Sequence, residues 1–93
     1  MNLEYTKRAE EDLRLAIKWY EDQRVGLGFE FLDCVEFAVK RIIAFPESYE
    51  KPYKSYHRCV VRRFPFSVFY TIEDDIIIVH AVFDNRQDPE KFP

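Results

Sequence analysis

Basic side chains are concentrated in one short stretch of the sequence. A guanidinium fork matches the oxygens of phosphate and a lysine supplies a point charge, so such a stretch is typical of a site for phosphate or for an acidic partner. Arg86, further along the chain, is a separate candidate for the same role. The candidates within the stretch are Lys51, Lys54, His57, Arg58, Arg62 and Arg63.

The charge of the whole chain hides this asymmetry. The net charge is -3 and the isoelectric point is near 5.4, which argues against a protein coated uniformly with positive charge for nucleic acid. Residues 50–63 nevertheless carry five basic side chains against the single acidic Glu50, whereas residues 73–93 carry six acidic and two basic side chains. The local field around residues 50–63 is therefore the one suited to phosphate or to an acidic partner.

The positions of the arginines in the predicted elements limit which of them can act together. Residues 57–64 read as a strand, in which side chains alternate between two faces. Arg62 and Arg63 would then point to opposite faces, and one of them would pack through its methylene groups against the covered side or the rim of the sheet. Arg86 comes directly after the last predicted strand. From there its side chain is expected either to point back towards the middle of the sheet or to pair with Asp88.

Other kinds of chemistry find little support in the sequence. His57 and Cys59 lie two residues apart on one predicted strand, but a structural zinc site needs four ligands and no further Cys/His cluster is present. There is no glycine-rich phosphate loop, no nucleophile elbow and no paired-carboxylate signature. We expect no metal and no cofactor, and we expect His80, which lies in an apolar run, to be a hydrogen-bonded core or rim residue.

The cysteines and several aromatic residues favour structural roles. Cys34 and Cys59 are too few for a disulfide framework, so we expect reduced and buried thiols. Trp19 and three tyrosines could stack on nucleobases, but aromatic residues in a small domain more often form its core or the lid of that core. The three tyrosines are Tyr49, Tyr53 and Tyr56.

Two helices are predicted in the first half of the chain. After a short strand around Leu3 and Tyr5, Thr6 is a suitable N-cap, and apolar residues then recur with helical spacing over about Lys7–Gln23. Residues 24–28 contain both glycines of the protein and predict the joint of a helical hairpin. The second helix ends before Pro46, and its apolar stripe is Leu32, Val35, Val39 and Ile42, widened by Phe31, Ala38 and Phe45.

Three strands follow the helical hairpin at close spacing. They are predicted over His57–Phe64, Phe66–Glu73 and Ile76–Phe83, separated by a kink at Pro65 and by a turn at residues 74–75. Short links make antiparallel neighbours. The sequence thus predicts an α+β fold of order β-α-α-β-β-β, with the helical hairpin on one face of a four-stranded, mainly antiparallel sheet, and the other face is where function would be sought.

The class of protein follows from length and hydropathy. The 93 residues suffice for one compact domain, which we assign to residues 1–93. No apolar run approaches the roughly 18 to 20 residues of a membrane span, and residues 2–6 are not typical of a signal peptide. We therefore expect a single globular domain in the cytoplasm.

Several strings of residues, in this order along the chain, resemble the RelE/ParE superfamily of toxins from bacterial type II toxin–antitoxin modules, also known as plasmid-stabilisation proteins. The resemblance covers essentially the whole chain. Its most telling features are the arginine before a Phe-Pro-aromatic turn and the closing Arg-x-x-Pro-x-x-aromatic. The matching strings are the Leu3–Thr6 start with its acidic first helix, Gly26–Leu32, Arg62–Tyr70 and Ile78–Phe92.

This resemblance implies a toxin neutralised by a co-encoded antitoxin, whose disordered tail folds over it, and it leaves a homodimer open. ParE-like members inhibit DNA gyrase, and RelE-like members cleave mRNA on the ribosome. Metal-free RNA cleavage needs a deprotonated 2′-hydroxyl, charge balance at phosphorus and a protonated leaving oxygen. By resemblance, Arg62 and Arg86 hold the places of two arginines of the RelE site, and Lys51, Lys54 and His57 are the residues that could supply the remaining catalytic groups.

The sequence departs from the RelE pattern near its end. RelE ribonucleases carry a tyrosine there, whereas Phe92 has no hydroxyl to exchange a proton. The acidic isoelectric point also fits poorly with docking into ribosomal RNA. We therefore expect ParE-like inhibition of gyrase, in which case the protein is not an enzyme. The alternatives are a RelE-like ribosome-dependent mRNA endonuclease and a catalytically degenerate member whose main interaction is with the antitoxin.

Overall fold

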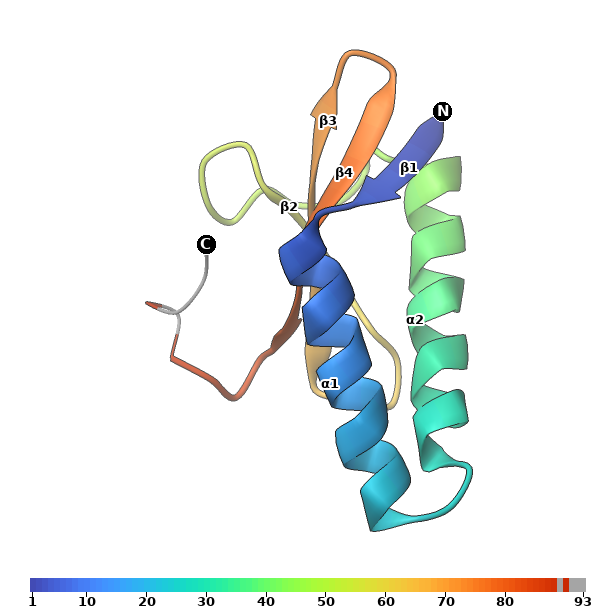
Figure 1. The fold of residues 1–93 in the computed structure, drawn as a ribbon. Helices are drawn as coiled ribbons and strands as arrows, with labels where there is room; N and C mark the ends of the chain where they lie inside the picture. Colours follow the sequence, from blue (N-terminus) through green and yellow to red (C-terminus); the bar gives the residue numbers. More distant parts are fainter. Residues whose placement is uncertain (89, 91–93) are drawn as a thin grey trace.

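The computed structural model describes residues 1–88 and residue 90 as two helices and one four-stranded sheet (Figure 1). The α+β fold and the order of its elements are as predicted. Across the described residues, neither helix is long and apolar enough to cross a membrane. The elements are β1 (Asn2–Tyr5), α1 (Lys7–Gln23), α2 (Leu27–Ala44), β2 (His57–Val60), β3 (Phe66–Glu73) and β4 (Ile76–Asp84).

Helix α1 has the bounds that the sequence predicted. The hydroxyl of Thr6 accepts a hydrogen bond from the backbone N–H of Ala9 at 3.1 Å, which satisfies one of the donors left open at a helix start. Ala9, Ala16 and Tyr20 are the buried residues of its inner face. The N-cap prediction for Thr6 is thus confirmed.

A close contact at the helical joint fixes how α1 meets α2. Gly26 has a φ of +90°, a left-handed conformation that glycine adopts at little cost. The carboxylate of Glu21 accepts hydrogen bonds from the backbone N–H groups of Gly26 (2.8 Å) and Gly28 (2.9 Å). A Cβ atom at Gly28 would lie only 2.7 Å from the carbonyl oxygen of Ile17. Gly28 therefore allows the backbones of the two helices to approach.

The strands follow the order β1-β4-β3-β2. The pairs β2–β3 and β3–β4 are antiparallel as predicted, and β1 lies parallel to β4. A register shift at residues 69–70 of β3 leaves His80 of β4 between the paired positions. In this strand order, the first strand of the chain, β1, lies beside the last one, β4, at the edge of the sheet farthest from β2 (Figure 1).

Strand β2 is shorter than predicted, because the chain turns after it. The sequence predicted a strand over His57–Phe64, but β2 ends at Val60. Arg63 has a φ of +70°, which no strand residue can adopt, although the N–H of Val61 still donates to the carbonyl oxygen of Phe66 at 2.9 Å. The placement of Arg62 and Arg63 on opposite faces of a strand was therefore wrong, since both lie in the β2–β3 loop.

One face of the sheet is covered by the helical hairpin. Helix α1 packs over β4, and α2 packs over β2 and β3. The hydroxyl of the fully buried Tyr70 donates to the carbonyl oxygen of Pro46 at 2.7 Å, which ties the end of α2 to the sheet. Phe45, predicted to widen the apolar stripe, is 63% exposed, because α2 ends at Ala44 and the chain turns away. Aromatic rings fill the centre: Tyr20, Phe31, Phe64 and Phe66.

The opposite face of the sheet carries a smaller apolar cluster. Phe69, Ala81 and Phe83 are buried there, and Tyr56 packs against them. His80 lies on the neighbouring stretch of β4, with Nε2 at 2.8 Å from the hydroxyl of Thr71 and its ring edge-on to Tyr56. The prediction of a hydrogen-bonded rim histidine is confirmed, and burial lowers the pKa of this imidazole.

Substitution of Gly28 by alanine tests the helical joint. The new methyl group would meet a backbone carbonyl, so we expect the free energy of unfolding to fall by about 1–3 kcal/mol, as in other overpacked sites. Urea denaturation followed by circular dichroism measures this. Gly26→Ala is the matched comparison, because nothing lies within 4 Å of that position and only its positive φ opposes a side chain. An unchanged denaturation midpoint for Gly28→Ala would contradict the close-approach argument.

Candidate functional site

The basic stretch does not form a single surface. Arg58 and Arg62 line a hollow of about 430 Å³ between α2 and the edge strand β2, together with Arg41 of α2. We call this hollow the β2 groove. Its apolar part includes Phe37 and Val60, which are 44% and 58% exposed. Half-exposed apolar side chains beside several cations are typical of a surface that binds a protein partner.

The three arginines of the β2 groove differ in the side chains that their guanidinium groups already contact. Arg58 forms an ion pair with Glu50, and Nε of Arg41 donates to the hydroxyl of Tyr49 at 2.9 Å. The guanidinium of Arg62 lies over the ring of Phe37, 4.7 Å from its centroid. Across residues 1–88 and 90 no ion pair of Arg62 is found. Arg62 can therefore take a carboxylate or a phosphate without breaking an ion pair. Arg41 can do so by giving up its hydrogen bond to Tyr49, whereas Arg58 would have to leave Glu50.

Arg63, although adjacent in sequence, serves the fold. Its guanidinium donates to the carboxylate of Glu30 at 2.8 Å, and Glu30 also forms an ion pair with Arg24 at 3.2 Å. The hydrogen bond from Arg63, supported by Arg24, lowers the pKa of Glu30. This network ties the β2–β3 loop to the helical joint, so Arg63 is less available to a partner than Arg62.

The remaining residues of the basic stretch are placed in two different environments. His57 is only 5% exposed, its ring stacks on Tyr70, and Nδ1 lies 2.9 Å from the carbonyl oxygen of Tyr49. Lys51 and Lys54 are exposed on the loop before β2, where Nζ of Lys54 lies 5.3 Å from the centroid of the Tyr53 ring. The structure therefore separates His57 from the lysines with which the sequence grouped it.

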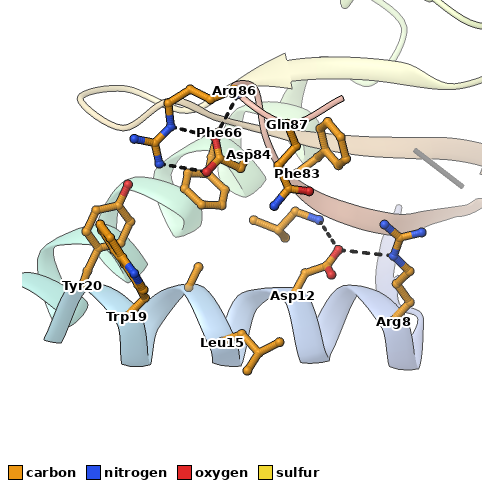
Figure 2. A pocket seen from close by; sticks show the side chains of 12 residues that line it. Arg8, Asp12, Leu15, Trp19, Tyr20, Phe66, Phe83, Asp84, Arg86 and Gln87 are labelled. Atoms are coloured by element: carbon orange, nitrogen blue, oxygen red, sulfur yellow. Dashed lines mark hydrogen bonds and ion pairs between the residues drawn. The ribbon is translucent and has the colours of Figure 1, made fainter. Parts of the chain in front are cut away.

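Arg86 lines a second hollow, of about 390 Å³, between α1 and the end of β4 (Figure 2). We call it the α1 groove, because α1 forms one wall and the end of β4 with residues 84–87 forms the other. Nε and Nη2 of Arg86 donate to the two carboxylate oxygens of Asp84 at 3.0 and 2.8 Å. The predicted alternative of a pair with Asp88 was wrong, because the guanidinium of Arg86 pairs with Asp84. The carboxylate of Asp84 also accepts a hydrogen bond from the backbone N–H of Arg86, at 2.9 Å, which holds the two residues together.

Arg62 and Arg86 thus do not meet. Arg62 lines the β2 groove and Arg86 lines the α1 groove, and neither groove includes the other arginine. The two hollows flank opposite edges of the sheet, one at β2 and one beside β4 where β1 has ended. The candidates that the sequence grouped by charge are distributed over separate surfaces.

Several features were not visible in the sequence. Trp19 and Tyr53 are 54% and 48% exposed, so neither is a core residue. The expected alternative, a place on the lid of the core, fits Trp19, whose ring packs edge-on to Tyr20. Cys59 is buried as expected, whereas Cys34 is only half-buried, and both thiols are free. Among the described residues, no group of three or more His, Cys, Asp or Glu side chains could hold a metal ion.

The ion pair at Asp84 gives a test of this geometry. The hydrogen bond from Arg86 lowers the pKa of Asp84, so the pair stabilises the folded state above the ordinary aspartate pKa of about 3.9, and this contribution is lost as the pH falls through the lowered value. We expect Arg86→Gln to raise the pKa of Asp84, measured by carboxyl ¹³C NMR titration. Arg14→Gln, which removes a cation paired with Glu11, is the control. An Asp84 pKa that is the same in wild type and Arg86→Gln contradicts the pairing.

Comparison with known proteins places the chain in a family. Residues 3–89 match the sequence model of the ParE toxin of the type II toxin–antitoxin system parDE. Among solved structures, the chain is similar to a chromosomal ParDE toxin–antitoxin system from P. aeruginosa, with a TM-score of 0.67 and 17% sequence identity over 90% of this chain and 95% of that one. No curated protein sequence gives a significant match. The family match spans nearly all of the chain, and this protein therefore belongs to the ParE toxin family of type II toxin–antitoxin systems.

Proposed function

We propose that this protein is a toxin that acts in the cytoplasm by binding and inhibiting DNA gyrase, and that a co-encoded antitoxin neutralises it. The observation that carries the proposal is the separation of Arg62 from Arg86 into two grooves. Membership of the ParE family supports it further, because the resemblance of the sequence assigns gyrase to ParE-like toxins.

Cleavage of RNA requires groups that converge on one phosphate. A base, a cation for the phosphorane and an acid must all lie within hydrogen-bonding distance of the reacting atoms. Here one arginine lies over Phe37, the other is held by Asp84 in a different groove, and the ring of His57 is buried. The sequence-based preference for gyrase inhibition also used the lack of a hydroxyl on Phe92, and this residue lies outside the described part of the chain. This distribution favours inhibition by binding over catalysis.

The β2 groove is the surface that we assign to the target. It combines a guanidinium without a carboxylate partner, Arg62, with the exposed apolar side chains of Phe37 and Val60. Burial of the apolar groups supplies affinity, and the cation selects an acidic counterpart and speeds the encounter. An acidic surface patch of gyrase with apolar side chains at its centre fits this chemistry.

A gyrase supercoiling assay tests the proposal. We expect the purified protein to inhibit supercoiling of relaxed plasmid, and Arg62→Ala to weaken that inhibition by about tenfold or more, as for a central arginine of an interface. The control is Arg14→Ala, which removes the same charge from the exposed face of α1, where Arg14 pairs with Glu11, and should leave inhibition unchanged. Equal loss in both variants would show that net charge matters and not the groove.

The same preparation discriminates between the two targets. Supercoiling that continues at a large excess of the protein, together with cleavage of mRNA on translating ribosomes, would contradict the gyrase proposal and support the endonuclease alternative. Absence of both effects, with no arrest of growth on induction in a bacterial host, would instead indicate a degenerate member.

A further inference from the structure

Helix α2 carries a row of exposed side chains on its solvent-facing side. Residues four apart are neighbours on a helix surface, so a row with this spacing forms a continuous ridge. Phe29, Phe37 and Phe45 are 69%, 44% and 63% exposed, and Asp33 and Arg41, which alternate with them, are exposed as well. We call these five residues the α2 ridge. Three exposed phenylalanines in one row are typical of a surface that binds another protein.

The two charged residues of the α2 ridge do not neutralise each other. They lie two helical turns apart, which is about 12 Å along the axis, with Phe37 between them. Across residues 1–88 and 90, no ion pair of Asp33 or Arg41 is found. Nε of Arg41 donates to the hydroxyl of Tyr49 at 2.9 Å, a hydrogen bond that a carboxylate can replace. The ridge therefore offers a partner both an acceptor and a donor.

The α2 ridge is symmetric about Phe37. From either end it runs phenylalanine, charge, phenylalanine, charge, phenylalanine, and only the sign of the charge differs between the two directions. A twofold axis through Phe37 that sets a second α2 antiparallel places Asp33 of each copy opposite Arg41 of the other. Phe29 and Phe45 then lie at the ends of the contact. Such an isologous contact, in which residue i meets j and j meets i, is the arrangement of most homodimers.

The geometry of helix packing permits this contact. Rows of residues four apart are inclined to the helix axis, and two such rows run side by side when the helices cross at about −50°, the commonest class of helix packing. The guanidinium of Arg62 lies over the ring of Phe37, 4.7 Å from its centroid, and this contact orients the ring at the centre of the ridge. A parallel pair of helices would set Asp33 against Asp33 and Arg41 against Arg41, which is repulsive.

We propose that the α2 ridge is the interface of a homodimer, in which two copies of this chain pack their α2 helices antiparallel about Phe37. Burial of the phenylalanine rings supplies the affinity, and the two pairs of Asp33 with Arg41 fix the direction of the helices. This inference goes beyond the proposed function and does not depend on it. Phe37 and Arg41 also line the β2 groove, so a second copy competes with the target that we assign to that groove.

Sedimentation velocity over a range of protein concentrations tests the dimer. We expect the wild-type protein to show a monomer–dimer equilibrium, and Phe37→Ala to raise the dissociation constant by about tenfold or more, as for an aromatic residue at an interface centre. Trp19→Ala is the matched control, because it removes an aromatic ring that is 54% exposed on α1 and lies outside the α2 ridge. It should leave the dissociation constant unchanged. Circular dichroism checks that both variants are folded.

Exchange of charge tests the pairing within the dimer. Asp33→Arg puts guanidinium groups at both charged positions of the ridge, and Arg41→Asp puts carboxylates at both. Each variant alone then brings like charges together, so we expect each to dimerise more weakly than wild type. In an equimolar mixture of the two variants, both pairs have opposite charges again. The mixture should therefore form a heterodimer with a dissociation constant close to that of wild type.

Two results would overturn the inference. A wild-type protein that stays monomeric up to its highest soluble concentration leaves the α2 ridge to a partner of another sequence. A dimer whose dissociation constant is the same in wild type, Phe37→Ala, Asp33→Arg and Arg41→Asp associates through a different face. Neither result decides the proposed function, because inhibition of gyrase is measured separately in the supercoiling assay.

Discussion

The close contact between the two helices at Gly28 is the constraint on which the rest of the structure depends. With no side chain at this position, the backbone of α2 approaches the carbonyl of Ile17, and the Glu21 carboxylate then bridges Gly26 and Gly28. This joint sets α1 over β4 and α2 over β2 and β3. Both candidate grooves have a helix as one wall, so their shapes follow from the placement of the helical hairpin on the sheet.

Ion pairs within the protein decide which arginines are available to bind a carboxylate or a phosphate of a partner. Glu50, Glu30 and Asp84 hold Arg58, Arg63 and Arg86, respectively. These pairs are solvent-exposed and individually weak, but they orient the guanidinium groups and neutralise much of the positive field that the sequence suggests. Arg62, whose contact is with the ring of Phe37, retains its charge for a partner. Of the arginines in the basic stretch, Arg62 is thus the one that no carboxylate of the described residues holds, while Lys51 and Lys54 lie exposed on the loop before β2.

The two grooves differ in the groups that already contact their arginines. In the β2 groove, a cation accompanies exposed apolar side chains beside an edge strand. In the α1 groove, both arginines face carboxylates of the protein itself, and the backbone edge of β4 carries an internal carboxylate.

Local signals in the sequence determined the elements. The hydroxyl of Thr6, the glycine joint and Pro46 mark the ends of the helices, and runs rich in β-branched and aromatic residues mark β3 and β4. Each of these signals acts through neighbours in the chain. Tertiary contacts decided the rest. The parallel placement of β1 beside β4, the burial of His57, the exposure of Trp19 and the choice of Asp84 over Asp88 by Arg86 depend on packing and backbone geometry that no local pattern specifies. The sequence therefore identified the fold and the candidate cations, while only the packed structure decided which of them share a surface.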